Sequence, residues 1–442
     1  MKIYIAIKIL MIKFIALIIV KNINNKFKLN EYIINYQKEL SKKFNFKISK
    51  KIRVGIYTLC LKNGGRARLA SMLINSLYKV KLFNIFLYTT ELKENDEYIY
   101  PKFIKRSIIK NNNITKIFKN KIDILIFHLK DYKTIKLLNK YNNIKVIYYI
   151  HNSIFNYLYL NYTNFKLLYK EYSKSNYIVS LIPFENDFLF KKWGINSILM
   201  DSFITYNYKR TIPSDVSSKK ILMIGRGNDK NKRFEKGIRS IEYIIQVIKE
   251  CELKIISQLY QINDLINLID NLKLRNYIRI EGFKEYSDIF FKNASLHFFP
   301  SISESFGLVL CETKIYGIPN ILLGIDYISI ARNGTIIIHD DMPETLAKET
   351  IKILLNNKYR EYLGKEARRN MEKYNNELLT QKWMNLIINI FKDDSYYHKL
   401  KRQKMKITDK EGLLIFNRQN QIFKMRNKDN ISIYQNYNFI DN

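Results

Sequence analysis

The stretch from residue 296 to residue 312, LHFFPSISESFGLVLCE, decides the fold. Its first four residues are apolar except for His297 and stop at Pro300, which predicts a short strand buried on both faces. A polar turn follows, and the pattern then predicts a helix that begins near Phe306 and continues over residues 307–316. A buried strand that leads through a turn into a helix is the repeating unit of an α/β domain.

The same unit recurs along most of the chain, in two series separated by a linker at residues 211–214. Continuous apolar strands with helices between them indicate parallel sheets covered on both faces. The strands predicted before the linker are 53–58, 83–89, 123–127, 145–150, 176–181 and 198–199. Those predicted after it are 220–225, 253–257, 278–281, 296–299, 320–323 and 335–339. We therefore expect an α/β protein with two Rossmann-like, doubly wound domains that face a cleft, with an N-terminal hydrophobic segment before them.

The domain boundaries follow from this rhythm. Residues 1–50 are a hydrophobic, membrane-anchor-like segment with a basic linker, and 51–205 form the N-terminal Rossmann-like acceptor domain. Residues 206–377 form the C-terminal Rossmann-like donor domain, 378–391 a closing helix, and 392–442 a polar tail. A chain of 442 residues is long enough for two cores, so the division agrees with its size.

Residues 3–20 are apolar except for Tyr4, Lys8 and Lys13, and their length matches one membrane span. Each central lysine would cost about 2.5–3.5 kcal/mol on insertion, so a buried or frayed N-terminal helix remains the alternative. No small-residue cleavage site follows Val20, and the next residues are rich in lysine, as cytosolic flanks of membrane segments are. We expect membrane association through residues 3–20, with the catalytic domains facing the cytosol.

Composition narrows the function classes. The 75 Lys and Arg against 40 Asp and Glu give a formal charge of +35, which could favour nucleic acid, anionic membranes or phosphate-bearing substrates. Lys, Asn, Ile and Tyr are abundant everywhere, so a general compositional bias explains much of this charge. No short basic and aromatic module that reads single-stranded nucleic acid is present, and we expect no nucleic-acid partner.

The three cysteines, Cys60, Cys251 and Cys311, lie far apart without a CxxC pair, so neither zinc nor a disulfide framework is indicated. The five histidines show no metal-ligand spacing, and we expect no metal site.

Two acidic residues and a glycine carry the chemistry of the 296–312 stretch. The first backbone N–H groups of a helix have no intrahelical partners, so the start of this helix suits a diphosphate. Gly307 has no β-carbon in the way of a phosphate. Glu304 in the turn and Glu312 in the helix are suited to hydrogen-bonding sugar hydroxyls, although Glu304 alone could simply favour a helix start.

A second motif, residues 224–233, IGRGNDKNKR, lies between a strand and a helix. Arginine offers two parallel N–H donors to phosphate oxygens, and lysine offers a point charge. Arg226 and Lys232 are therefore candidates for neutralising a leaving diphosphate, and Lys236, which precedes a glycine, is the alternative lysine. The alternative for the remaining basic residues is a solvated surface loop.

Two shorter signals lie in the N-terminal half. Gly64 and Gly65 follow the first strand and precede a helix, where they could expose backbone amides to a ligand, although such a pair is usually just a turn. His151 ends a predicted strand, and a lone histidine is more often structural than catalytic.

The string from Glu304 to Glu312 resembles the E-x7-E motif of retaining family-4 glycosyltransferases, the group 1 glycosyl transferases of the GT-B fold. The resemblance implies that Glu304 lies by the donor sugar and Glu312 by the ribose. It also implies that the amides of Phe306, Gly307 and Leu308 bind the diphosphate.

Arg226 and Lys232 resemble the basic pair of the same family, and Gly64 and Gly65 its glycine-rich loop, where Arg68 matches a basic residue. His151 matches a histidine found near the reacting sugar in that family. Phe283, in the segment 281–283, resembles the position beside the nucleotide base. The resemblance covers about residues 52–391 and is most specific over 221–325.

The function expected from this resemblance is transfer of a hexose, with retention, from a nucleotide-diphosphate sugar to a glycan or lipid-linked acceptor. No cofactor is expected; a UDP- or GDP-linked sugar is the co-substrate. Electrostatic stabilisation of the leaving diphosphate would dominate, and no enzyme carboxylate needs to act as a nucleophile. The alternatives are a non-catalytic membrane-associated sugar-nucleotide-binding protein and an epimerase or hydrolase on the same fold.

Overall fold

The computed structural model describes residues 51–392, with short gaps. The gaps are residues 63, 92–97, 112, 130, 139–143, 155–161, 210, 228, 260–261, 283–287, 326 and 341. The predicted anchor segment at residues 3–20 and nearly all of the predicted polar tail therefore lie outside the described residues. Among the described helices, none is both long and apolar enough to cross a membrane.

The N-terminal half contains a parallel sheet of seven strands in the order β3-β2-β1-β4-β5-β6-β7. Its strands are β1 (Ile52–Thr58), β2 (Phe83–Thr89), β3 (Lys105–Ile108), β4 (Ile124–Phe127), β5 (Lys145–Tyr149), β6 (Tyr177–Ser180) and β7 (Ile198–Leu199). Its helices are α3 (Gly65–Tyr78), α4 (Thr115–Lys119), α5 (Tyr132–Leu138), α7 (Tyr162–Ser173) and α8 (Pro183–Trp193). Every residue of β4 and β6 is buried, because helices cover both faces of a parallel sheet.

The C-terminal half contains a second parallel sheet, of six strands in the order β10-β9-β8-β11-β12-β13. Its strands are β8 (Lys220–Ile224), β9 (Glu252–Ser257), β10 (Ile278–Gly282), β11 (Leu296–Phe299), β12 (Asn320–Leu323) and β13 (Thr335–Ile338). Its helices are α9 (Phe234–Val247), α10 (Asn263–Asn271), α11 (Leu308–Ile315), α12 (Pro343–Leu355) and α13 (Asn357–Asn370), with the 3₁₀ turns η1 (Lys230–Lys232) and η2 (Asp288–Phe290). Two doubly wound α/β sheets agree with the expected fold class.

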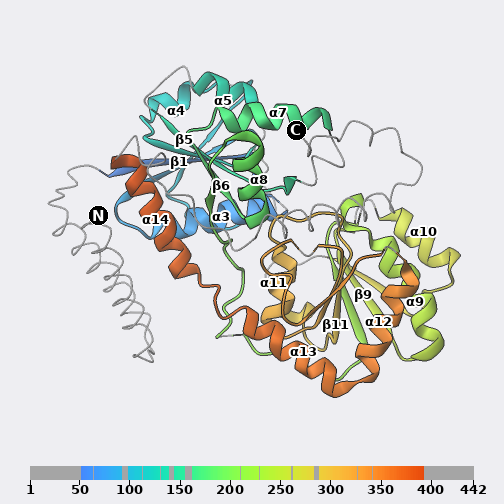
Figure 1. The fold of residues 1–442 in the computed structure, drawn as a ribbon. Helices are drawn as coiled ribbons and strands as arrows, with labels where there is room; N and C mark the ends of the chain where they lie inside the picture. The colour runs from blue at the N-terminus through green and yellow to red at the C-terminus, as the bar shows by residue number, and fades with distance from the viewer. Residues whose placement is uncertain are drawn as a thin grey trace. The chain divides into compact units, whose positions relative to one another are not determined.

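Strand β8 shows how the second sheet builds two cores. Ile221 and Met223 point into a cluster that includes residues of α9 and α12, whereas Leu222 and Ile224 pack with Tyr316, which follows α11. Figure 1 shows the same arrangement, with α9 and α12 on one side of this sheet and α11 on the other. Because successive side chains of a strand point to opposite faces, an uninterrupted apolar strand serves both clusters.

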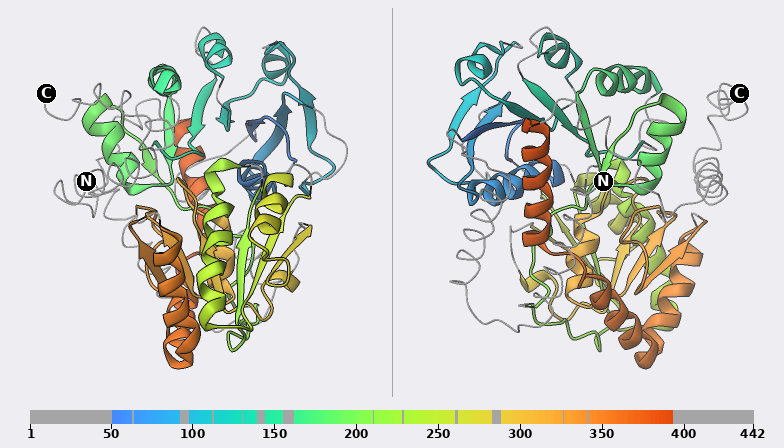
Figure 2. Two further views of the ribbon diagram at one scale, coloured as in Figure 1. Left: turned by 90° about the vertical axis from the view of Figure 1, so that its right-hand side faces the viewer. Right: turned by 60° about the vertical axis from the view of Figure 1, so that its left-hand side comes forward.

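The last described helix, α14 (Asn376–Lys392), packs against the N-terminal half, where it contacts α3. The Trp383 and Tyr149 rings meet edge to face with centroids 5.2 Å apart. The Lys145 Nζ donates a hydrogen bond of 2.8 Å to the carbonyl of Ile390. Lys145 and Tyr149 belong to β5, and both views in Figure 2 show α14 beside the N-terminal sheet.

Two sequence-based helix starts are wrong, and one strand was not predicted. The helix of the 296–312 stretch begins at Leu308 and not near Phe306, because Gly307 has a φ of 82° and lies before the helix. Helix α3 begins at Gly65, four residues before the predicted start at Leu69. Strand β3 was not predicted, since its sequence KRSI is partly exposed at the sheet edge and has no apolar run.

Candidate active site

The candidate site residues follow the carboxyl ends of central strands. Arg226 comes two residues after β8, and Glu304 lies in the loop after β11. His151 follows β5 in the other sheet. Parallel strands deliver the loops after them to one edge of the sheet, which is where α/β proteins bind ligands.

Lys232 and Glu304, which lie in the segments after β8 and β11, form an ion pair. The Lys232 Nζ lies 2.5 Å from the Glu304 Oε1, and their side chains are only 18% and 15% exposed. The same ammonium lies 5.6 Å from the centroid of the Phe299 ring. Lys236, the alternative lysine, lies on α9, where its charge contributes to the lowered pKa of Glu344. The geometry therefore favours Lys232 as the lysine of this site.

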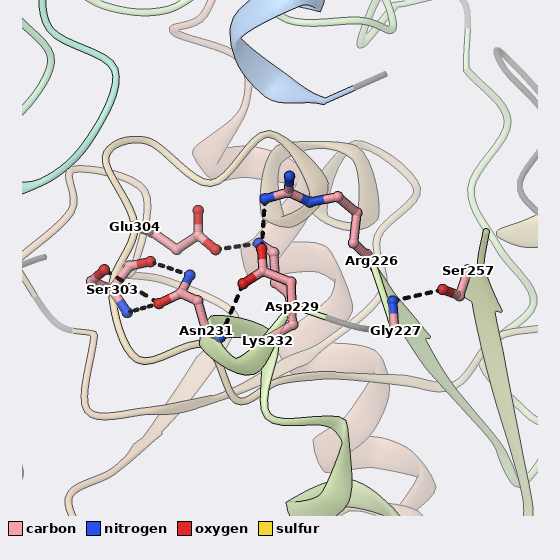
Figure 3. Close-up of polar contacts among 8 residues, drawn as sticks. All are labelled: Arg226, Gly227, Asp229, Asn231, Lys232, Ser257, Ser303 and Glu304. Atoms are coloured by element: carbon pink, nitrogen blue, oxygen red, sulfur yellow. Dashed lines mark hydrogen bonds and ion pairs between the residues drawn. The ribbon is translucent and has the colours of Figure 1, made fainter. Parts of the chain in front are cut away.

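Arg226 lies at the same edge but reaches solvent. Its side chain is 58% exposed, and its Nη2 lies 2.5 Å from the Oδ2 of Asp229 (Figure 3). The peptide N–H of Gly227 donates to the Ser257 hydroxyl at 2.8 Å, and a β-carbon at Gly227 would lie 2.6 Å from Ile262. The turn is thus packed tightly beneath Arg226, while the guanidinium stays accessible to a ligand.

The start of α11 follows Glu304 by four residues and has no side-chain cap. Gly307 is its N-cap with a φ of 82°, a conformation that favours glycine, and no side chain caps the helix. Leu308 is its first residue, and Phe306 just before it is 2% exposed. The first N–H groups of a helix have no intrahelical acceptor, so this end can bind an anion.

Glu312, in α11, is held by residues from the N-terminal half. Its Oε1 forms an ion pair with the Arg68 guanidinium and accepts a 2.8 Å hydrogen bond from the Thr205 hydroxyl. A β-carbon at Gly65 would lie 3.6 Å from the Leu308 side chain. Gly65 and Leu308, which are far apart in sequence, therefore lie side by side in the folded chain. Sequence reasoning named Arg68 without a role and did not identify Thr205.

His151 forms a close pair with His128. Its Nε2 lies 2.7 Å from the Nδ1 of His128, and the two rings stack with centroids 4.8 Å apart. Burial lowers the pKa of His128 to about 3, with a further contribution from the Arg66 charge. Burial, the neighbouring His128 and Arg66 also hold the pKa of His151 well below its usual value. Both imidazoles are therefore neutral near pH 7, and one donates to the other.

Sequence reasoning missed His128, although a signal was present: it directly follows the apolar strand β4, as His151 follows β5. It also missed Tyr327, whose buried hydroxyl accepts the Glu304 peptide N–H at 3.0 Å and hydrogen-bonds Ser153.

Gly64 lies at the N-cap of α3 with a φ of 109°, and Phe283 lies outside the described residues. Among the described residues no group of His, Cys, Asp or Glu is arranged to hold a metal ion, and the absence of a catalytic metal stays a prediction. All three cysteines are buried and free.

Residues 206–370 match the family model of the glycosyl transferases group 1. A comparison with curated proteins finds no match.

Among solved structures, a sucrose-phosphate synthase from Thermosynechococcus elongatus is similar, with a TM-score of 0.66 and 15% identity over 77% of this chain and 99% of that one. A TarM variant from S. aureus, in complex with fondaparinux, α-GlcNAc-glycerol and UDP, has a TM-score of 0.62 and 14% identity over 76% and 99%. Anabaena HepE, in complex with UDP and glucose, has a TM-score of 0.62 and 13% identity over 76% and 99%. At these identities the likeness shows the GT-B fold.

The family match covers the segment that carries Arg226, Lys232, Glu304 and Glu312, and the fold extends the likeness over both sheets. The chain is a glycosyltransferase whose residues 206–370 form a group 1 glycosyl transferase domain.

Proposed function

We propose that this enzyme moves a hexose from a nucleotide-diphosphate sugar to a hydroxyl of a glycan or lipid-linked acceptor, with retention of configuration. The observation that carries the proposal is the 2.5 Å ion pair between Lys232 of η1 and Glu304 of the loop that leads into α11. A cation, a carboxylate and free helix amides in one place suit a donor that carries both a diphosphate and a sugar.

In this proposal, positively charged side chains and peptide amides bind the diphosphate of the donor, and carboxylates bind its sugars. Lys232, the accessible Arg226 guanidinium and the amides of residues 306–308 would hold the two phosphates, while Glu312 would bind the ribose. The structures of TarM and HepE contain UDP, which supports a UDP-linked donor as the first to test. In this proposal the sugar nucleotide is a co-substrate, and the reaction requires no cofactor.

In the transfer step the bond between the anomeric carbon and the diphosphate oxygen breaks, and the acceptor oxygen bonds to the same carbon on the same face. The acceptor proton passes to the departing diphosphate, so the charges balance without an enzyme nucleophile. Fixed cations aimed at the leaving group lower the barrier by several kcal/mol, on the order of 3 for each strong donor. Neutral His151 would hydrogen-bond the donor sugar or position the acceptor.

The test is a screen of UDP- and GDP-hexoses with a panel of glycan and lipid-linked acceptors, in which nucleoside diphosphate release is measured. NMR of the product gives the configuration of the new linkage. We expect acceptor-dependent release and a retained anomer. Release without any acceptor would indicate a hydrolase, interconversion of the sugar nucleotide an epimerase, and binding without turnover a non-catalytic protein; each result would overturn the proposal.

Arg226→Ala should lower kcat by about 100-fold or more, because it removes a donor to the leaving group. The fold should survive, since the side chain is 58% exposed. Arg239→Ala, at an exposed position of α9, is the matched control and should leave turnover unchanged. Equal turnover of wild type and Arg226→Ala, at equal melting temperature, would remove Arg226 from the site.

A further inference from the structure

Asn231 holds the loop of Glu304 with its side-chain amide and its backbone carbonyl. The Asn231 carbonyl accepts the N–H of Ile302 at 2.8 Å. Its side-chain Oδ1 accepts the N–H of Ser303 at 3.0 Å and the Ser303 hydroxyl at 3.3 Å, while its Nδ2 donates to the Ser303 carbonyl at 3.0 Å. Figure 3 shows this pairing, in which the amide of Asn231 faces the backbone of Ser303. A side-chain amide that accepts from the N–H of one residue and donates to the carbonyl of the same residue fixes both the position and the orientation of that residue.

The same asparagine belongs to the turn that carries the basic residues. It lies at the centre of η1, directly before Lys232, and its own N–H donates to the Asp229 Oδ1 at 3.0 Å. The other oxygen of Asp229 accepts from Arg226. Asn231 is therefore bonded to the turn of Arg226 and Lys232 on one side and to the loop of Glu304 on the other.

The ion pair depends on this connection. Lys232 follows Asn231 and Glu304 follows Ser303, so the four contacts between Asn231 and residues 302–303 bring the two charged side chains into register. Ser303 is 4% exposed, so water does not readily replace these bonds. Without Asn231 the loop must move to satisfy its peptide groups, and a displacement of about 1 Å in a site of this kind can cost about 100-fold in rate.

We propose that Asn231 is a positioning residue for sugar transfer, which holds Lys232 and Glu304 in the arrangement that meets the donor. The proposal rests on the proposed function. Asn231 acts through its neighbours and does not itself contact the donor. Tyr327 supports the other side of the same loop, because its hydroxyl accepts the Glu304 N–H.

The experiment compares kcat, KM and affinity for UDP among wild type, Asn231→Ala and Asn231→Asp. Aspartate keeps the acceptor for Ser303 and loses the donor to its carbonyl, so we expect kcat in the order wild type, Asn231→Asp, Asn231→Ala. We expect at least a tenfold loss for the alanine variant, with a smaller change in KM. Asn231→Asp keeps the test decisive if Asn231→Ala fails to fold, and Tyr327→Phe, which removes one hydroxyl from the same loop, should also lower kcat.

Asn356→Ala is the matched control. Asn356 caps α13 by accepting the Tyr359 N–H at 2.9 Å, so its loss should lower the melting temperature and leave kcat unchanged. Unchanged kcat in Asn231→Ala, or a loss no larger than that of the control, would overturn the proposal. An active wild type with an unaffected Asn231→Ala rejects this inference alone, whereas a wild type that neither turns over any donor nor binds UDP rejects the proposed function and this inference with it.

Discussion

At the scale of single residues, His128 and His151 form an uncharged pair that follows strands β4 and β5 of the N-terminal sheet. His128 is 2% exposed and cannot take a proton without placing a charge in a site already next to Arg66. A proton on His151 would face the same cation and the neighbouring ring. His151 can therefore exchange hydrogen bonds with a sugar hydroxyl across the neutral range, and it is poorly suited to act as an acid.

The pH profile of transfer should consequently lack a step from His151 near pH 6.5, the ordinary pKa of histidine. Since the pKa is lowered, the imidazole stays neutral as pH falls through 6.5 and protonates only at more acidic pH. The measurement is kcat/KM from pH 5 to pH 8 for wild type and His151→Asn. A step between pH 6 and pH 7 that is present in wild type and missing in His151→Asn would contradict the neutral pair.

How far sequence could predict the site differs from residue to residue. Glu304 and Glu312 lie in a recognisable string, so both could be named in advance. Spacing favoured Lys232 but left Lys236 as an alternative, because the choice depends on which lysine faces Glu304 after the turn folds. The contact between Arg68 and Glu312 joins positions 244 residues apart, and no local pattern predicts such a pair.

At the scale of elements, α11 is fixed by a buried lysine. The Lys314 Nζ donates to the carbonyls of Ile330 and Arg332, and to that of Asn333 at 2.9 Å. The side chain is fully buried, and burial lowers its pKa to about 7. This one amine connects α11 to the loop that leads into β13.

Lys314→Met should lower the free energy of unfolding by about 2–4 kcal/mol, because it leaves carbonyl oxygens buried without a donor. Lys352→Met is the matched control on α12, where the side chain is 62% exposed, and should change stability little. Urea denaturation of both variants measures the difference. Equal unfolding midpoints for the two variants would show that the three carbonyl contacts contribute no net stability.

Strand prediction succeeded where the sequence carries apolar residues and failed for the polar edge strand β3. Strands β4, β11 and β12 are fully buried and were predicted, although the predicted β4 was one residue too long. The edge strand β3 has a polar sequence and owes its extended form to pairing with β2, which local sequence does not encode. The start of α11 was misplaced because the left-handed conformation of Gly307 cannot be distinguished in sequence from a helical glycine.

At the scale of the whole molecule, buried titratable groups set opposing pH dependences of stability. His128, His151 and His297 have lowered pKa values, mainly through burial, so the unfolded chain binds protons below pH 6.5 that the folded chain does not. These groups make stability fall as pH drops below 6.5. Glu185 acts in the opposite sense, because burial raises its pKa from 4.5 to about 8. The folded chain keeps a proton there that the unfolded chain releases above pH 4.5.

The Glu185→Gln variant isolates the contribution of Glu185 to the pH dependence of stability. The glutamine replaces a protonated carboxyl that accepts a 3.1 Å hydrogen bond from the Ser180 hydroxyl, so it can keep this contact while it no longer titrates. The stability of the variant relative to wild type should rise with pH between about 5 and 8, by about 1.4 kcal/mol per pH unit for one proton. Thermal and urea unfolding at half-unit pH intervals measure it, with Glu361→Gln at an exposed position of α13 as the control. Since the histidines are unchanged, both proteins should still lose stability below pH 6.5, and the loss should be steeper in Glu185→Gln. A stability difference between the two proteins that does not vary with pH would show that Glu185 is ionised in the folded chain.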